Sequence, residues 1–340
     1  MKFYLLIGLL LVSSTVRGQA TEPPATPHST FRAAVDIVAL NIVVTDSQQT
    51  FIKGLTTSDF SVFEDGVRQD VSFFAASAVP IDLAILLDTS ASMTDKIDTV
   101  QRAAIGFAST LRGGDRVTIV DIKDGSRIVA PLGEDLEAAK LAILSTRAMG
   151  GTALYDGLYL SLREMIRERH VAARGAATSL RCVVPSPCDA MGGVRRQALV
   201  VLSDGEDTSS LMSFDDVMQL ARESGIAVYT ITLKSKHAPP AAVTSQQKHF
   251  SQSDYAMKAF AQETGARAFF PATIADLAGV YSTIAEELAS QYSIGYTSKN
   301  PKRDGAYRRV VVRINERTGV QTRTRAGYFA ARGERTTARH

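Results

Sequence analysis

Between residues 80 and 290, short apolar runs alternate with longer segments whose apolar residues recur every three or four positions. The runs 81–88 (IDLAILLD) and 197–203 (QALVVLS) are almost continuously apolar, which is typical of strands buried on both faces of a parallel sheet. The pattern predicts strands at 81–88, 116–122, 126–131, 197–203, 226–233 and 266–270, and helices at 94–112, 136–144, 154–170, 214–224, 254–264 and 274–290. This alternation predicts an α/β fold with a doubly wound, mostly parallel sheet flanked by helices.

The segments on either side, 34–77 and 291–330, alternate polar and apolar residues as antiparallel strands with one solvated face do. The predicted strands are 35–44, 59–65, 67–74, 292–297, 307–314 and 320–328. Asp65-Gly66 is a strong hairpin dipeptide between two of them. We expect the two segments to pair into one small β domain into which 80–290 is inserted; two independent β pieces are the alternative.

The N-terminus has the features of a secretory signal peptide. Lys2 precedes the apolar run FYLLIGLLLV, and small residues follow up to Gly18 and Ala20, either of which could precede the cleavage site. The run is short for a membrane span, so we expect a signal peptide at 1–20 and no transmembrane span in the mature chain. An uncleaved N-terminal anchor is the alternative. The predicted location is secreted, periplasmic or in the cell envelope.

The amino-acid composition limits the classes of partner and the environment that we expect for this protein. Lys and Arg number 38 against 35 Asp and Glu, a net charge of +3, so nothing indicates a nucleic-acid partner. The Pro- and Thr-rich segment 21–33 is predicted to be a linker, and the polar tail 331–340 to be disordered. Cys182 and Cys188 lie in a predicted insertion at 172–196, and in an exported protein they are expected to form a local disulfide.

Oxygen-bearing side chains stand at three junctions between a strand or loop and a helix. Asp88, Ser90 and Ser92 end and follow the run 81–88, Thr152 follows a glycine pair, and Asp204 follows 197–203. In open α/β sheets such junctions are where ligands bind. Carboxylates with hydroxyls suit a hard cation, Mg²⁺ first, with Mn²⁺ or Ca²⁺ possible. Each residue also has a simpler use, because Asp88 and Ser90 can cap a helix and Asp204 can form an Asx-turn.

The motif DTSAS at 88–92, the distant Thr152 and the motif SDGED at 203–207 resemble the von Willebrand factor A-type domain over residues 80–290. The resemblance implies that Asp88, Ser90, Ser92, Thr152 and Asp204 form a metal-ion-dependent adhesion site. It also implies a protein partner whose Asp or Glu carboxylate contacts the metal. With the flanking segment GLTTSDFSVFEDGVRQDVSFF, the chain resembles an exported bacterial group related to this family.

These features favour a metal-dependent protein-binding or adhesion module. A structural or assembly protein of the cell envelope, with a non-essential metal site, is the first alternative. A metal-assisted hydrolase is the second, but the sequence has no G-x-S-x-G nucleophile elbow and no P-loop, so no enzyme activity is expected. Residues that could form a rim around the metal, or could equally lie in the core, are Met93, Thr94, Met149, Tyr155, Leu211 and Met212.

Overall fold

The computed structural model describes residues 37–76, 79–179, 195–204, 207–233, 251–315 and 317–332, with backbone only at 173–179. The predicted signal peptide, the predicted linker and the Cys182–Cys188 disulfide lie outside the described residues, as do residues 333–340 of the predicted disordered tail.

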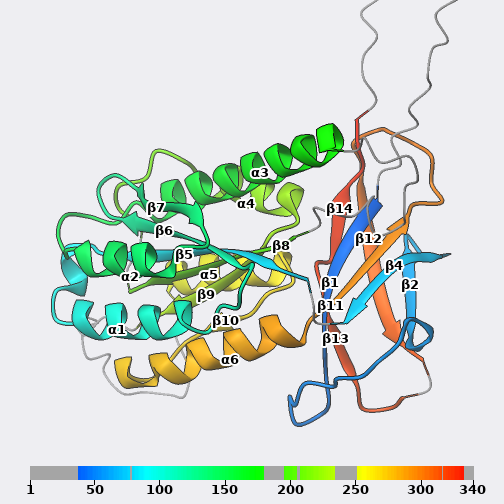
Figure 1. Ribbon diagram of the computed structural model, residues 1–340, viewed down its shortest axis with the longest axis horizontal. Helices are drawn as coiled ribbons and strands as arrows, with labels where there is room; N and C mark the ends of the chain where they lie inside the picture. Colours follow the sequence, from blue (N-terminus) through cyan, green and yellow to red (C-terminus); the bar gives the residue numbers. More distant parts are fainter. Residues whose placement is uncertain are drawn as a thin grey trace, which may run out of the picture. The chain divides into compact units, whose positions relative to one another are not determined.

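The α/β part is built on a six-stranded sheet with the order β10-β9-β8-β5-β6-β7 (Figure 1). Its strands are β5 (Ile81–Asp88), β6 (Arg116–Ile122), β7 (Arg127–Gly133), β8 (Arg196–Ser203), β9 (Ala227–Thr232) and β10 (Ala268–Phe269). Every neighbouring pair is parallel except β6–β7, which is antiparallel at the sheet edge. The predicted fold class, a mostly parallel sheet in an α/β protein, is confirmed.

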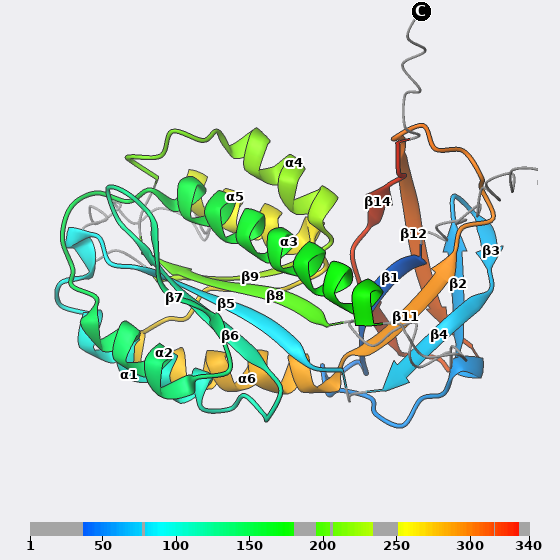
Figure 2. The ribbon, with the colours of Figure 1, turned by 45° about the horizontal axis from the view of Figure 1, so that its top comes forward.

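In the described part of the chain, helices cover both faces of this sheet (Figure 2). One face carries α1 (Ile97–Ala108), α2 (Leu136–Ser145) and α6 (Leu277–Ser290); the other carries α3 (Leu154–Ser179), α4 (Phe214–Ser224) and α5 (Gln252–Glu263). Because successive strand residues point to opposite faces, Leu83, Ile85 and Leu87 of β5 pack in the first core, and Ala84 and Leu86 in the second. This explains why β5 is apolar almost throughout.

The two ends of the described chain pair with each other. β1 (Ile37–Thr45) lies antiparallel to β11 (Tyr292–Thr297), and β2 (Phe60–Glu64) lies antiparallel to β12 (Tyr307–Ile314). The resulting sheets have the orders β13-β1-β11-β4 and β14-β12-β2-β3. Their remaining strands are β3 (Val67–Gln69), β4 (Val71–Ala76), β13 (Gln321–Arg323) and β14 (Gly327–Phe329). The predicted β domain made from both terminal segments is confirmed, and its two sheets share one apolar core.

Several predicted elements have different bounds. The strand expected at 67–74 is divided, because the chain leaves one sheet after Gln69 and enters the other at Val71. The strand expected at 320–328 is likewise two short strands, β13 and β14. The helix expected to end near residue 170 continues to Ser179, into the predicted insertion, because VAARGAATS is rich in alanine, the strongest helix former.

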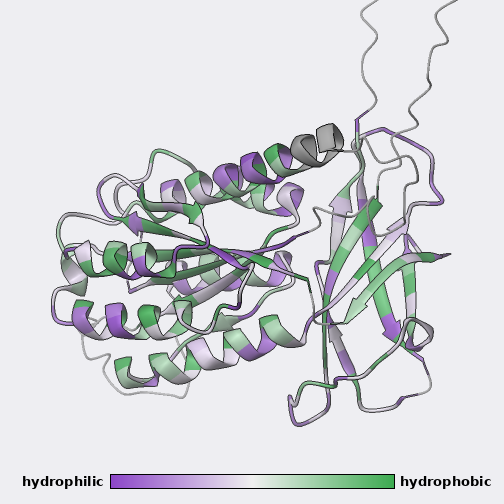
Figure 3. Cartoon of the chain, in the orientation of Figure 1, coloured by the Kyte–Doolittle hydropathy of each residue, from purple (hydrophilic) through white to green (hydrophobic). Residues whose placement is uncertain are grey.

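The distribution of hydrophobic residues agrees with this arrangement of strands and helices. In Figure 3 the central strands of the α/β part are largely hydrophobic, whereas its helices show hydrophobic and hydrophilic residues side by side. An amphipathic helix buries one stripe and leaves the other in water. Among the described residues, none of the helices combines the length and the apolar content that crossing a bilayer requires.

Candidate metal centre

The predicted site residues lie at the point where the chain reverses its direction across the sheet. From β5 the chain proceeds to β6 on one side, and later returns to β8 on the other side of β5. Asp88 ends β5, and Asp204 directly follows β8, whose Leu202 is opposite Leu87. Parallel neighbours bring these two carboxylates to the same edge, at the switch point where ligands bind in open α/β sheets.

Backbone hydrogen bonds join the three loops at this edge. The Ala91 N–H donates to the Gly150 carbonyl at 2.9 Å, and the Met149 N–H donates to the Thr89 carbonyl at 2.8 Å. The Thr152 carbonyl in turn accepts the N–H of Thr208 at 2.9 Å. The loop after β5, the loop before α3 and the loop after β8 therefore hold one another in place.

The glycine pair before Thr152 is required by close packing. Gly150 has a φ of +74°, and a Cβ at this position would lie 2.0 Å from a carboxylate oxygen of Asp124. A Cβ at Gly151 would lie 2.4 Å from the Ser209 hydroxyl, and the Gly151 N–H donates to Asp124. Only glycine lets the chain turn this tightly and so reach Thr152 at the same edge.

Four of the five predicted residues are linked by direct hydrogen bonds. The hydroxyls of Ser90 and Ser92 are 2.9 Å apart, the Ser92 hydroxyl donates to Asp204 Oδ1 at 2.6 Å, and the Ser90 N–H donates to Asp88 Oδ1 at 2.9 Å. The fifth, Thr152, is held by backbone hydrogen bonds to Thr208, on the loop that follows Asp204. Asp88, Ser90, Thr152 and Asp204 are buried, whereas Ser92 is exposed. The set is therefore accessible from solvent on the side of Ser92.

The Asp88 carboxylate is buried without a basic partner. The Ser203 hydroxyl donates to its Oδ2 at 2.6 Å, but none of the ion pairs among the described residues involves Asp88. Burial raises the pKa of Asp88, against the opposing effect of hydrogen bonds from Ser203 and Ser90. A buried carboxylate in this condition is stabilised by a bound cation.

Lys96 is a member of this site that sequence reasoning missed. It lies between the short 3₁₀ turn η2 (Ala91–Met93) and α1, and its ammonium forms an ion pair with Asp204 Oδ2. A lysine four residues after Ser92 is visible in SMTDK, but such residues usually face solvent. A sequence signal for a short turn at 91–93 could have identified Lys96, because this turn directs the chain back over the ends of the strands.

Nearby acidic and apolar residues have distinct uses. Asp207 accepts the Leu154 N–H at 2.8 Å and so caps the start of α3, and Asp156 accepts the Leu211 N–H at 3.0 Å. Of the two alternatives for Met93, rim or core, the structure supports the core, because this side chain is fully buried. Met149 and Leu211 are 58% and 90% exposed.

The donor set fits a hard divalent cation. Two carboxylates and three hydroxyls supply only oxygen, which Mg²⁺ prefers, and they leave room in an octahedral shell for water or an outside ligand. Among the described residues, no group of three or more His, Cys, Asp or Glu side chains gathers around a point where a metal could bind, so the candidate site depends on its hydroxyls as well as its two carboxylates. Hydroxyl and carboxylate oxygens are ligands of hard cations rather than of softer metals. The capping alternative does not hold for Ser90, whose side chain makes no capping bond to η2.

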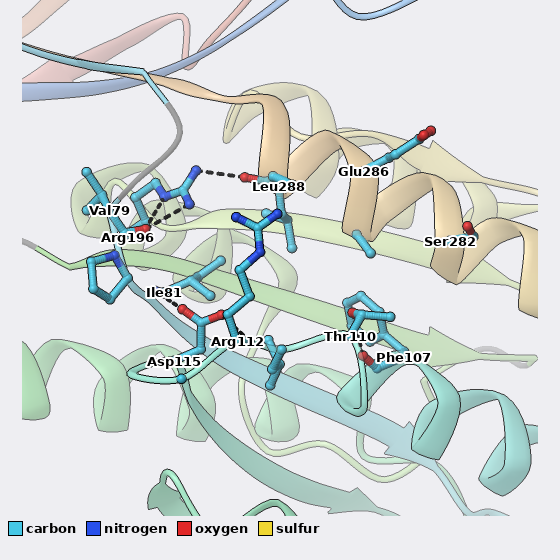
Figure 4. A pocket seen from close by; sticks show the side chains of 15 residues that line it. Val79, Ile81, Phe107, Thr110, Arg112, Asp115, Arg196, Ser282, Glu286 and Leu288 are labelled. Carbon is cyan, nitrogen blue, oxygen red and sulfur yellow. Dashed lines mark hydrogen bonds between the residues drawn. The ribbon is translucent and has the colours of Figure 1, made fainter.

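A cavity of about 340 Å³ lies at the other end of β5, beside its first residue, Ile81 (Figure 4). It is bounded by the end of α1 and by α6 and includes Arg112 and Arg196. The Arg196 guanidinium donates to the carbonyls of Val79 and Leu288. This cavity is separate from the metal centre because it lies at the opposite end of the strand.

A segment of the chain matches a known protein family. Residues 83–206 match the family model of the von Willebrand factor type A domain. No curated protein sequence matches the chain. Among solved structures, a von Willebrand factor type A protein from Catenulispora acidiphila is similar, with 13% identity over 90% of this chain and 76% of that one, and a TM-score of 0.44.

Two further structures are similar over a smaller share of this chain. BatB from Bacteroides thetaiotaomicron has 17% identity over 61% of this chain and 98% of its own, with a TM-score of 0.42. Proximal thread matrix protein 1 from the mussel byssus, with a zinc-occupied MIDAS motif, has 15% identity over 67% of this chain, with a TM-score of 0.44. The chain spans half the length of that mussel protein. The family match covers residues 83–206, so this segment of the chain is similar to a von Willebrand factor type A domain.

Proposed function

We propose that this protein is an exported binding module that holds a divalent cation at Asp88, Ser90, Ser92, Thr152 and Asp204 and uses it to engage a carboxylate of a protein partner. The observation that carries this proposal is the convergence of these residues from three loops at one sheet edge, where Ser92 is exposed. When bound, the metal supplies a Lewis-acidic position that an oxygen ligand from outside can fill.

The chain's own residues have separate parts in this proposal. Asp88 and Asp204 supply the negative charge that retains the cation. The hydroxyls of Ser90, Ser92 and Thr152 are neutral donors, so the bound metal would remain electrophilic and able to accept another ligand. The hydrogen bonds that join the three loops preorganise these donors. Preorganisation limits the ordering cost that binding would otherwise carry. Mg²⁺ is the expected metal, with Mn²⁺ or Ca²⁺ as substitutes.

Export is part of the proposal and is supported by the signal-peptide pattern at 1–20. Outside the cytoplasm the predicted disulfide between Cys182 and Cys188 is chemically permitted. The partner is then a protein of the envelope, the cell surface or the medium that presents an exposed Asp or Glu. Met149 and Leu211, which flank the site in sequence and are exposed, are candidate contacts for apolar residues beside that carboxylate.

A hydrolase is the less favoured function. Hydrolysis at a metal needs a general base within hydrogen-bond reach of the attacking water. The histidine in the described part of the chain, His170, lies 16 residues after Leu154 along α3, about 24 Å from the start of that helix. We propose binding without turnover. A structural envelope protein whose metal site is not essential stays the alternative, and the experiment below separates the two.

Affinity capture tests the proposed function. The purified protein is incubated with native envelope extract or medium in Mg²⁺ and, in parallel, in EDTA. We expect Asp88→Ala to lose the Mg²⁺-dependent partner, while Asp98→Ala, which removes an exposed acid from the first turn of α1, retains it. A partner recovered equally in Mg²⁺ and EDTA would favour the structural alternative.

A further inference from the structure

Lys96 places a fixed positive charge inside the proposed metal site. Its side chain is 11% exposed, and its ammonium contacts Oδ2 of Asp204, whose own side chain is fully buried. The other oxygen of Asp204, Oδ1, accepts the Ser92 hydroxyl at 2.6 Å. Both oxygens of this ligand are thus occupied before any outside group arrives.

The position of Lys96 is set by local structure. Its N–H donates to the Met93 carbonyl at 2.8 Å, and its own carbonyl accepts the N–H of Val100 at the start of α1 at 3.0 Å. These bonds hold the residue in the turn between η2 and α1. Because these hydrogen bonds fix the backbone of Lys96, its side chain extends from a defined position and reaches Asp204.

The charge of the site changes sign when a divalent cation is added. Asp88, Asp204 and Lys96 contribute two negative charges and one positive charge, a net charge of −1. A divalent cation brings the sum to +1. Without Lys96 the same site would be neutral when loaded. In a buried, poorly screened environment one elementary charge is a large difference.

We propose that Lys96 couples the binding of the metal to the binding of a carboxylate. This inference rests on the proposed function and adds a residue to it. Lys96 repels an incoming divalent cation and competes for Asp204, so metal binds weakly on its own. The same charge makes the loaded site net positive, so a carboxylate ligand from outside restores neutrality and strengthens metal binding. By linkage, metal strengthens carboxylate binding by the same factor.

A purely structural lysine would behave differently. If Lys96 only stabilised Asp204, its removal would lower the stability of the metal-free protein and leave the effect of a carboxylate on metal affinity unchanged. The decisive quantity is therefore the ratio of metal affinities measured with and without a carboxylate.

The experiment titrates the full chain with Mn²⁺, followed by electron paramagnetic resonance of the free ion, in sodium chloride and in sodium acetate of equal ionic strength. Lys96→Met keeps the length of the apolar stem and removes the charge, Lys96→Arg keeps the charge, and Lys140→Met removes a partly buried lysine on α2 that pairs with Glu137. Site-to-site couplings are commonly 5- to 150-fold. We expect Lys96→Met to bind Mn²⁺ about tenfold more tightly in chloride and to lose most of the acetate enhancement. Lys140→Met should match the parent chain, and Lys96→Arg should retain the acetate enhancement.

Two results would overturn the inference, and they are distinguishable. If the parent chain binds Mn²⁺ but Lys96→Met has the same affinity and the same acetate response, Lys96 has no coupling role and the proposed metal site stands. If the parent chain does not bind Mn²⁺ in either salt, the proposed function fails and this inference fails with it. Should Lys96→Met not fold, the parent chain still decides, because Mn²⁺ affinity that is equal in acetate and chloride contradicts the coupling.

Discussion

Two buried acids, Glu64 in the β domain and Asp88 in the α/β domain, have opposite surroundings. Glu64 is 2% exposed and accepts hydrogen bonds from Tyr296 at 2.9 Å and Tyr328 at 2.8 Å, with the Arg308 guanidinium 3.3 Å away. Asp88 is equally buried, but its described donors are a serine hydroxyl and a backbone N–H, without a basic side chain.

The pKa values of these acids differ in the same way. Burial alone would raise the pKa of Glu64, but hydrogen bonds from Ser298, Tyr328 and Tyr296 and the charge of Arg308 together hold it below its usual value. Burial raises the pKa of Asp88, and its hydrogen bonds do not offset this effect. A buried carboxylate with a full set of partners stabilises the fold, whereas one that lacks a cation is suited to bind one.

Glu64→Gln is expected to have the largest effect on stability. The substitution leaves Arg308, 3% exposed, without its carboxylate, and breaking a buried ion pair commonly costs about 3 kcal/mol or more. Urea unfolding measures the loss. The matched control is Glu137→Gln on α2, whose side chain is 78% exposed beside Lys140 and whose replacement should cost less than about 0.5 kcal/mol. Equal losses would mean that Glu64 is no more important than a surface acid.

Asp88→Asn should affect stability in the opposite way to Glu64→Gln. Without metal, stability should be unchanged or higher, because a neutral amide replaces a buried, unpaired charge. With metal at ten times its dissociation constant, the parent chain should gain about 1.4 kcal/mol, and the variant should gain nothing. Thermal unfolding with EDTA and with Mg²⁺ gives both numbers. If Asp88→Asn is strongly destabilised in EDTA, or is still stabilised by Mg²⁺, the proposed difference between Glu64 and Asp88 is contradicted.

Much of the fold was predictable because hydrophobic periodicity follows burial. Strand 81–88 and strand 197–203 are apolar on both faces, and the sheet places them side by side with helices on each face. The division of 67–74 was not predictable, since it depends on which sheet accepts each half of the segment. Helix length past residue 170 was underestimated because the residues that follow, which include glycine, serine and proline as well as alanine, were predicted to form an exposed insertion.

The site was predictable in part for a related reason. Asp88, Ser90, Ser92, Thr152 and Asp204 stand at element ends, where a pattern in the sequence locates them, and the loops bring them to one edge. Lys96 was missed because its inward orientation results from the turn at η2, which no periodicity reports. The sequence could not decide between rim and core for Met93 for the same reason, since its one-turn helix directs it into the core.

Thr152→Val should produce an intermediate effect on metal affinity. Valine has nearly the same shape and keeps the backbone bonds to Thr208, but it lacks the hydroxyl. Loss of a single group that orients or supports a metal commonly costs about tenfold in affinity. Calorimetric titration with Mn²⁺ measures the shift, and Thr146→Val, on the loop after α2, serves as the control. Unchanged affinity for Thr152→Val would exclude the Thr152 hydroxyl from the ligand set.

The pH dependence of stability should show the smallest effect. Because the folded-state pKa of Glu64 lies below its unfolded value, its stabilising contribution is present above the ordinary carboxyl pKa and is lost as pH falls through the folded value. Unfolding midpoints measured from about pH 5 to about pH 2 should therefore fall less steeply in Glu64→Gln than in the parent chain. Parallel curves would show that Glu64 does not contribute to acid lability.

The most direct test of the metal centre is a crystal structure of the protein grown with Mn²⁺ and acetate, recorded with anomalous scattering. The account predicts one strong anomalous peak about 2.0–2.3 Å from the hydroxyl oxygens of Ser90 and Ser92, beside Asp88, Thr152 and Asp204. An acetate oxygen should complete its shell on the solvent side. A structure with no anomalous peak at this edge of the sheet, or with the peak held by other residues, would contradict the account.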